Sequence, residues 1–408
     1  MNVWWISVRR SPARFASLVI LAVGIGMMFV SSTWVGLWTE TGGEVARTVT
    51  LLGPLAGATG ALSSAVWVSE GASLAAAGSA RRWVTQRLPQ VLAAAAYVLA
   101  PYLLVAVFAG ARTWRVAGVG VPAPGYLVLG AGLVLAYYGA GCVAGVLLPS
   151  RFFTPFAMLL AGLFFQAFVT VPLDGYVQQV VRSASLITVW LAAVVLLILA
   201  VSVRPRDSRV TAWTRWTRLG AAWLPGAAST AATVLVIAAL VVGARPMQVA
   251  RDPQPVCSGT PRVCLWPDHE VFREPLEAGL RRLSERMPPE MRLPDEVSEQ
   301  GLLQDNPMRL PPLWFAYSSL ASTVMEASFT LTCVPQEPAA QATFYEHNYA
   351  LLMWIMMTAN DGPPPPEIHG GPPGVDIPAI AAVVSSPAAQ QDSWLAAQIA
   401  ALRATKCP

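Results

Sequence analysis

The chain has 408 residues, of which 55% are hydrophobic and only 12% charged, and its mean hydropathy is +0.51. Soluble domains carry about 25% charged residues, so this composition excludes an ordinary soluble protein and indicates a membrane protein. Lys406 is the only lysine in the sequence. Because a nucleotide-binding P-loop requires a lysine after its glycines, we do not expect the chain to be a P-loop ATPase itself.

Charge divides the sequence into two regions near Arg245. Residues 1–245 hold 17 Arg and 5 acidic residues, a net charge of +12, whereas residues 246–408 hold 10 basic and 18 acidic residues, a net charge of −8. The two regions therefore suit different surroundings. We predict a transmembrane helical bundle over 1–245 and an extracytoplasmic, mainly α-helical domain over 246–408.

Seven apolar runs in the first region are long enough for a membrane-spanning helix, which needs about 20 residues. They cover residues 15–37, 48–69, 91–111, 126–148, 152–172, 183–203 and 221–243. Two pairs, Gly53-x-x-x-Gly57 and Gly141-x-x-x-Gly145, have the small-residue spacing that lets helices approach closely. The sequence thus predicts an all-α polytopic membrane protein with about seven transmembrane helices.

The arginines predict which way the bundle faces, because cytoplasmic segments are enriched in basic residues. With the N-terminus inside, 12 arginines fall in cytoplasmic segments and 4 in external loops. Seven spans then place the C-terminal domain outside the plasma membrane. We predict a multi-pass protein with its N-terminus inside and its C-terminus outside.

The cysteines agree with that topology. Cys142 lies in the fourth apolar run, and the other four cysteines, Cys257, Cys264, Cys333 and Cys407, all lie in the C-terminal domain. An even number of cysteines in an extracytoplasmic domain is typical of disulfides. Three pairings are possible; we favour Cys257–Cys264 with Cys333–Cys407, and four free thiols remain the alternative.

Helical patterns predict the main elements of the C-terminal domain. They cover residues 267–286, 311–333, 338–360 and 386–404, and the proline-rich segment 361–374 is expected to be an irregular loop. The stretch LLMWIMM within 338–360 has the spacing of a buried helix. We interpret it as core rather than as a ligand pocket.

No residue pattern of an enzyme or a metal centre is found. His269 and Glu270 resemble half of a zinc-binding helix, but Arg273 stands at the position where a second histidine would be needed. We therefore interpret His269 and Glu270 as a solvated first helical turn. We expect no catalytic residues, no metal, no cofactor and no nucleic-acid partner.

The loop between the second and third runs carries the strongest functional signal. It contains Glu70, Arg81, Arg82 and Arg87 in a helix-favouring, amphipathic segment of 24 residues, WVSEGASLAAAGSARRWVTQRLPQ (67–90). Cytoplasmic location explains the arginines, but not the length of the loop. A short helix lying on the membrane surface would explain both.

This arrangement resembles the type-2, exporter-like ABC transporter permease subunits, especially divergent actinobacterial permease-like proteins. The resemblance covers residues 1–205. It implies that the loop is a coupling helix, that Glu70, Arg81, Arg82 and Arg87 contact a separate ATP-binding subunit, and that the protein forms a homo- or heterodimer. A seventh span and an external domain depart from that family.

The alternative is a non-transporting, membrane-anchored sensory or binding protein. Its extracytoplasmic domain would recognise a ligand or partner, and the helices would anchor it.

Overall fold

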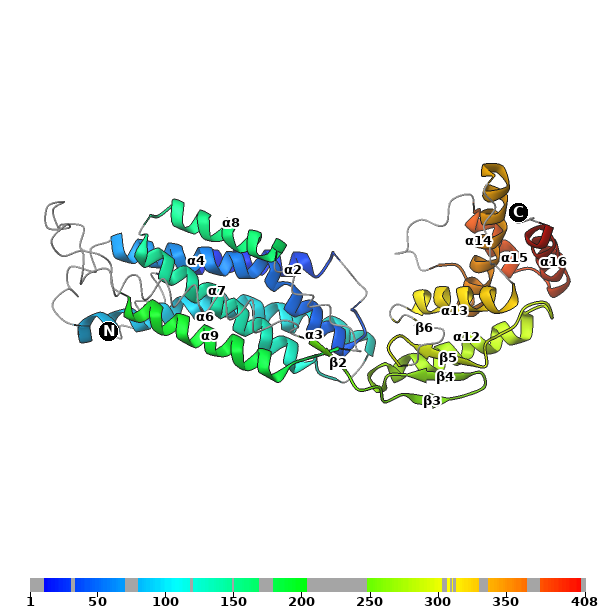
Figure 1. Cartoon of the computed structure of the whole chain (residues 1–408), viewed down its shortest axis with the longest axis horizontal. Coiled ribbons are helices and arrows are strands. Elements are labelled where there is room, and N and C mark those ends of the chain that lie inside the picture. Colours follow the sequence, from blue (N-terminus) through cyan, green and yellow to red (C-terminus); the bar gives the residue numbers. More distant parts are fainter. Residues whose placement is uncertain are drawn as a thin grey trace. The chain divides into compact units, whose positions relative to one another are not determined.

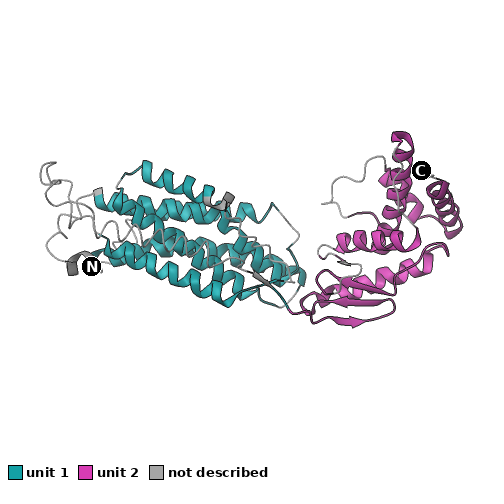
Figure 2. Ribbon diagram, in the orientation of Figure 1, with its two compact units in different colours: residues 1–251 teal, residues 252–408 magenta. Residues whose placement is uncertain are grey.

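The computed structural model of the chain divides into two compact units, Met1–Arg251 and Asp252–Pro408 (Figure 2). The structure describes residues 11–30, 34–69, 80–117, 120–148, 150–168, 179–203, 248–302, 307–308, 310, 313–329, 337–364 and 375–404. The division falls after Arg251, close to the change in charge at Arg245. Each unit is described by itself.

The first unit is a helical bundle (Figure 1). Its helices are α2 (Ala13–Met27), α3 (Trp38–Arg47), α4 (Val49–Ser69), α6 (Ala80–Ala117), α7 (Pro124–Leu147), α8 (Phe153–Phe168) and α9 (Ser183–Ser202). A two-stranded antiparallel ribbon joins β1 (Gln179–Val181) to β2 (Gln248–Ala250).

Among the residues that the structure describes, four helical segments are long and apolar enough to cross a membrane. They are Trp38–Val68, Val84–Ala117, Pro124–Leu147 and Ser183–Ser202. The expected spans 15–37 and 152–172 correspond to shorter apolar helices, Ala13–Met27 and Phe153–Phe164. The expected seventh span, 221–243, lies outside the described residues.

The outer faces of the bundle carry large apolar side chains that protein does not cover. Many of them lie on or beside α2, α6, α8 and α9, among them Phe15, Leu18, Leu103, Leu104, Val107, Phe152, Phe153, Phe156, Phe164, Ile187, Leu191 and Ile198. In water such a surface would be costly. In hydrocarbon it costs nothing, which fits a bundle surrounded by lipid.

Glycines bring α4 and α7 into backbone contact. A Cβ atom added at Gly141 would collide with the carbonyl of Gly57, and one added at Gly145 would collide with the carbonyl of Ala61. On the other helix, a Cβ at Gly53 would lie 2.7 Å from the ring of Tyr137. The close approach that the glycine spacing predicts is therefore present between these two helices.

The second unit combines helices with a small sheet that the sequence patterns did not predict. Strands β3 (Val256–Ser258), β4 (Arg262–Leu265), β5 (Glu296–Glu299) and β6 (Pro307–Met308) lie in that order, with β3–β4 antiparallel and the other pairs parallel. Each strand has only two to four residues. Such runs are too short to show an alternating pattern, so the expectation of a mainly helical domain omitted them.

The helices of the second unit follow the four predicted segments, and α15 is an additional helix that the patterns did not predict. They are the 3₁₀-helix η1 (Pro267–Phe272) and the α-helices α12 (Arg273–Arg286), α13 (Leu313–Ser328), α14 (Pro338–Asn360), α15 (Ile377–Val384) and α16 (Ala388–Ala404). Helix α14 carries the stretch LLMWIMM into the core, where Leu351, Trp354, Ile355 and Met357 are fully buried. The interpretation of this stretch as core is confirmed.

Candidate functional site

The segment 67–90 was expected to form a separate coupling helix, but its residues from Ala80 onward belong to a longer helix. Helix α6 runs without a break from Ala80 to Ala117, so this part of the loop continues directly into a membrane span. Glu70 and the side chains of Arg81 and Arg82 lie outside what the structure describes. The backbone places Arg81 and Arg82 in the first turn of α6.

Arg87 lies inside the bundle rather than on its surface, and only 2% of it is exposed. Its Nη2 donates a hydrogen bond to Ser64 Oγ at 2.5 Å, and its Nε donates to the Ala200 carbonyl at 3.4 Å. Its guanidinium lies 4.8 Å from the centre of the Trp67 ring. Arg87 therefore joins α4, α6 and α9, and the expectation that it contacts a partner protein is corrected.

A buried guanidinium is expensive unless it is compensated. Among the described residues no carboxylate pairs with Arg87, and the hydroxyl, the carbonyl and the indole ring are what stabilise it. The sequence contained a signal for this burial. Arg87 precedes Val91, Ala94 and Val98 at helical spacing, and all three are buried.

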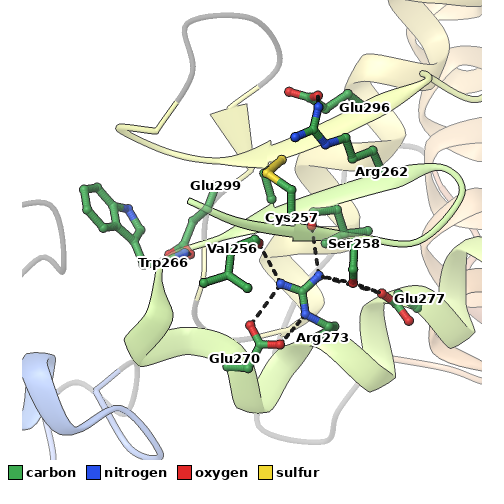
Figure 3. The surroundings of a disulfide bond; sticks show 12 residues. Val256, Cys257, Ser258, Arg262, Trp266, Glu270, Arg273, Glu277, Glu296 and Glu299 are labelled. Atoms are coloured by element: carbon green, nitrogen blue, oxygen red, sulfur yellow. Dashed lines mark hydrogen bonds and ion pairs between the residues drawn. A yellow bond between two sulfur atoms is a disulfide. The ribbon is translucent and has the colours of Figure 1, made fainter. Parts of the chain in front are cut away.

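In the second unit, Cys257 and Cys264 are joined by a disulfide (Figure 3). This is one of the two pairs that the sequence favoured. The two residues face each other in the β3–β4 register, so the bond closes the hairpin directly. Cys333 and Cys407 lie outside the described residues, and Cys142 is a free thiol buried in the bundle.

Arg273, the first residue of α12, fixes that hairpin to the helix (Figure 3). Its Nη1 donates to Ser258 Oγ at 2.6 Å and to the Val263 carbonyl at 2.9 Å, and its Nη2 donates to the Val256 carbonyl at 2.7 Å. The carboxylate of Glu270 accepts from the same guanidinium, and this hydrogen bonding raises the pKa of Arg273. One side chain thus holds both strands of the hairpin.

His269 and Glu299 form a buried pair at the end of β5, an inner strand of the same sheet. Their side chains are 1% and 2% exposed, so the interpretation of His269 as part of a solvated turn was wrong. His269 Nδ1 contacts Glu299 Oε1, and Glu299 Oε2 accepts from the Trp266 N–H at 3.1 Å. Because a carboxylate only accepts, the histidine proton lies on Nδ1.

The other nitrogen of His269, Nε2, is buried and has no partner among the described residues. Those residues also contain no group of three or more His, Cys, Asp or Glu side chains that could hold a metal ion. The pair is enclosed and joins η1 to β5. We assign it a structural role in the second unit.

The chain matches no protein-family model, no curated protein and no solved structure.

Proposed function

We propose that this chain is a membrane-anchored binding protein whose C-terminal unit lies outside the plasma membrane and recognises a ligand or partner. The observation that carries the proposal is the disulfide between Cys257 and Cys264 in a unit that has its own core. Disulfides persist in oxidising compartments and are rare in the cytosol. The three-to-one excess of arginines in the expected cytoplasmic segments supports the same orientation.

The second unit is large enough to be a folded module. Its core collects buried side chains from the sheet and from helices α12, α13, α14, α15 and α16. A membrane anchor that carries a separate folded module is an economical arrangement for presenting a binding surface to one side of a membrane.

A second candidate, the permease subunit of an ATP-driven transporter, is favoured by the length of α6. At 1.5 Å per residue, its 38 residues extend over about 57 Å, nearly twice the roughly 30 Å hydrocarbon core of a bilayer. The first turn, with Arg81 and Arg82, would then extend beyond the membrane, where a separate ATP-binding subunit could contact it.

Cysteine labelling on intact cells tests the orientation. In a protein carrying Cys142→Ser, Cys333→Ser and Cys407→Ser, only Cys257 and Cys264 remain to react. We expect a membrane-impermeant maleimide to label Cys257, which is partly exposed, after mild reduction and without permeabilisation, whereas Cys264 is fully buried. Labelling that requires permeabilised cells would overturn the proposed placement.

A matched control for sidedness uses Arg151→Cys in a cysteine-free protein. Arg151 is exposed and lies in the expected cytoplasmic segment between α7 and α8. It should be labelled only after permeabilisation.

The permease candidate is tested by purification in mild detergent. The candidate is established if a stoichiometric ATP-binding subunit copurifies with the chain and is lost when Arg81→Glu and Arg82→Glu are combined. The same subunit should be retained by the control Arg115→Glu, at the opposite end of the same helix. Recovery without such a subunit, unaffected by these changes, would refute it.

A further inference from the structure

A groove of 690 Å³ lies in the second unit between the end of α12 and the first turns of α16. This volume falls within the roughly 300–1,000 Å³ that is typical of small-ligand sites. Met287, Ala396 and Ile399 supply apolar surface along it. An aliphatic chain could lie against these side chains.

The charged side chains along the groove are mostly acidic. Glu285, Glu290 and Asp392 carry three negative charges, and Arg286 is the one base among the lining residues, so the groove has a net charge of −2. All four side chains are exposed, and within the described part of the chain no ion pair joins Arg286 to any of the three acids. Their charges therefore remain available to a ligand.

The side-chain amide of Gln391 adds an acceptor that has no donor among the described residues. Gln391 lines the groove and is only 7% exposed. Its Nε2 donates to the carbonyls of Val384 at 3.0 Å and Ser386 at 2.8 Å. Because carbonyls can only accept, the nitrogen must face them, which leaves Oε1 without a partner among the described residues.

The dipoles of the two helices do not reverse the sign of the groove. The C-terminal end of α12 is the negative end of its dipole, and the N-terminal end of α16 is the positive end of its own. Both ends border the groove, so these partial charges offset each other. The side chains decide the charge, and they favour a cation.

We propose that this groove binds an alkylammonium or alkylguanidinium group. Such a group only donates hydrogen bonds, which matches three carboxylates and the free Gln391 Oε1, and its aliphatic stem matches Met287 and Ile399. The group belongs either to a free polyamine or to a Lys or Arg side chain of a peptide. The inference deepens the proposed binding function and rests on it.

Calorimetric titration of the full chain in neutral-lipid nanodiscs tests this site. The probes are 1,5-diaminopentane, as a free amine, and the capped peptide Gly-Lys-Gly; the same peptide with an acetylated lysine is the uncharged control. We expect saturable binding of a charged probe, and which of the two binds more tightly identifies the source. Asp392→Asn and Glu290→Gln should each weaken binding by about tenfold, as expected for a charge-assisted hydrogen bond.

The matched control is Glu326→Gln, which removes one negative charge from an exposed position on α13, outside the groove. It should leave the affinity unchanged. Equal weakening by this variant, equal binding of the acetylated peptide, or no saturable binding of either charged probe would overturn the proposal. Unfolding curves of every variant must match the unchanged protein, so that a loss of binding reports the groove.

Failure of the groove and failure of the proposed function are distinguishable. External labelling of Cys257 with no amine binding would refute only the groove. Amine binding by a unit labelled only in permeabilised cells would refute the extracytoplasmic placement and leave the groove standing.

Discussion

Replacing Glu299 by glutamine tests how much the buried pair with His269 stabilises the second unit. The carboxylate accepts two hydrogen bonds, one from the Trp266 N–H and one from His269 Nδ1. A glutamine side chain offers one oxygen and one NH₂ group, so one of these two donors would face another donor. His269 could relieve the conflict only by moving its proton to Nε2, which is buried and has no partner among the described residues.

Either outcome leaves one buried N–H unsatisfied. The cost of such a group is about 1–3 kcal/mol, and hydrogen bonds to charged groups lie at the upper end. We therefore expect Glu299→Gln to lower the free energy of unfolding of the second unit by about 2–3 kcal/mol.

Pulse proteolysis in urea on the full chain in nanodiscs measures this change through cleavage of the C-terminal unit. Glu296→Gln is the matched control, because it lies on the same strand and makes an exposed ion pair with Arg262 at 3.5 Å, with side chains 36% and 60% exposed. Exposed pairs contribute about 0–1 kcal/mol. If Glu299→Gln costs no more than Glu296→Gln, the reasoning about the buried pair is wrong.

Three further predictions concern packing, the disulfide and pH. Gly141→Ala should lower the thermal unfolding temperature of the bundle in detergent, because the added methyl group would collide with the backbone of α4. The control Gly26→Ala, whose methyl group meets nothing within 4 Å, should leave this temperature unchanged or raise it. Equal effects of the two variants would exclude close packing as the cause. Replacing Cys257 and Cys264 by alanine opens a bridge with a sequence separation of 7 and should cost about 2.5 kcal/mol by loop entropy, measured by pulse proteolysis; no loss would refute the bridge. Burial raises the pKa of Tyr317 to about 12, so the folded and unfolded states both keep the phenol proton below pH 10, and only the unfolded state loses it between pH 10 and about 12. The free energy of unfolding of the second unit should therefore fall between these pH values. Unfolding curves recorded against pH measure this fall, and Tyr317→Phe should abolish this part of it.

The sequence determined the features that depend on composition and on regular spacing. Six of the seven apolar runs correspond to described helices of the bundle, because the membrane requires continuous apolar length, but they did not predict α3. The glycine spacing marked the positions on α4 and α7 where a close approach is possible, because a residue without a side chain lets the backbones of two helices come into contact. The charge change near Arg245 indicated two regions, and the structure separates its units after Arg251.

Tertiary structure decided the features that depend on which distant residues meet. Arg87 was expected at a surface because arginine is usually solvated. Its side chain is buried in the bundle instead, because Arg87 lies on the same helix face as the buried residues Val91 and Val98. His269 was expected in solvent because its partner, Glu299, lies 30 residues away on a four-residue strand. No local pattern encodes such a pairing, since a strand this short is defined by its neighbours in the sheet.

The groove shows the same division. Its acids are visible in the sequence, but Glu285 and Asp392 belong to helices separated by about 100 residues. Only the fold brings the end of α12 beside the start of α16, and only the packing around Gln391 turns its amide so that the oxygen is left free. Composition and periodicity determined what kind of protein this is, because both act through nearest neighbours and solvent, whereas long-range packing decided where its buried charges and its candidate binding groove lie.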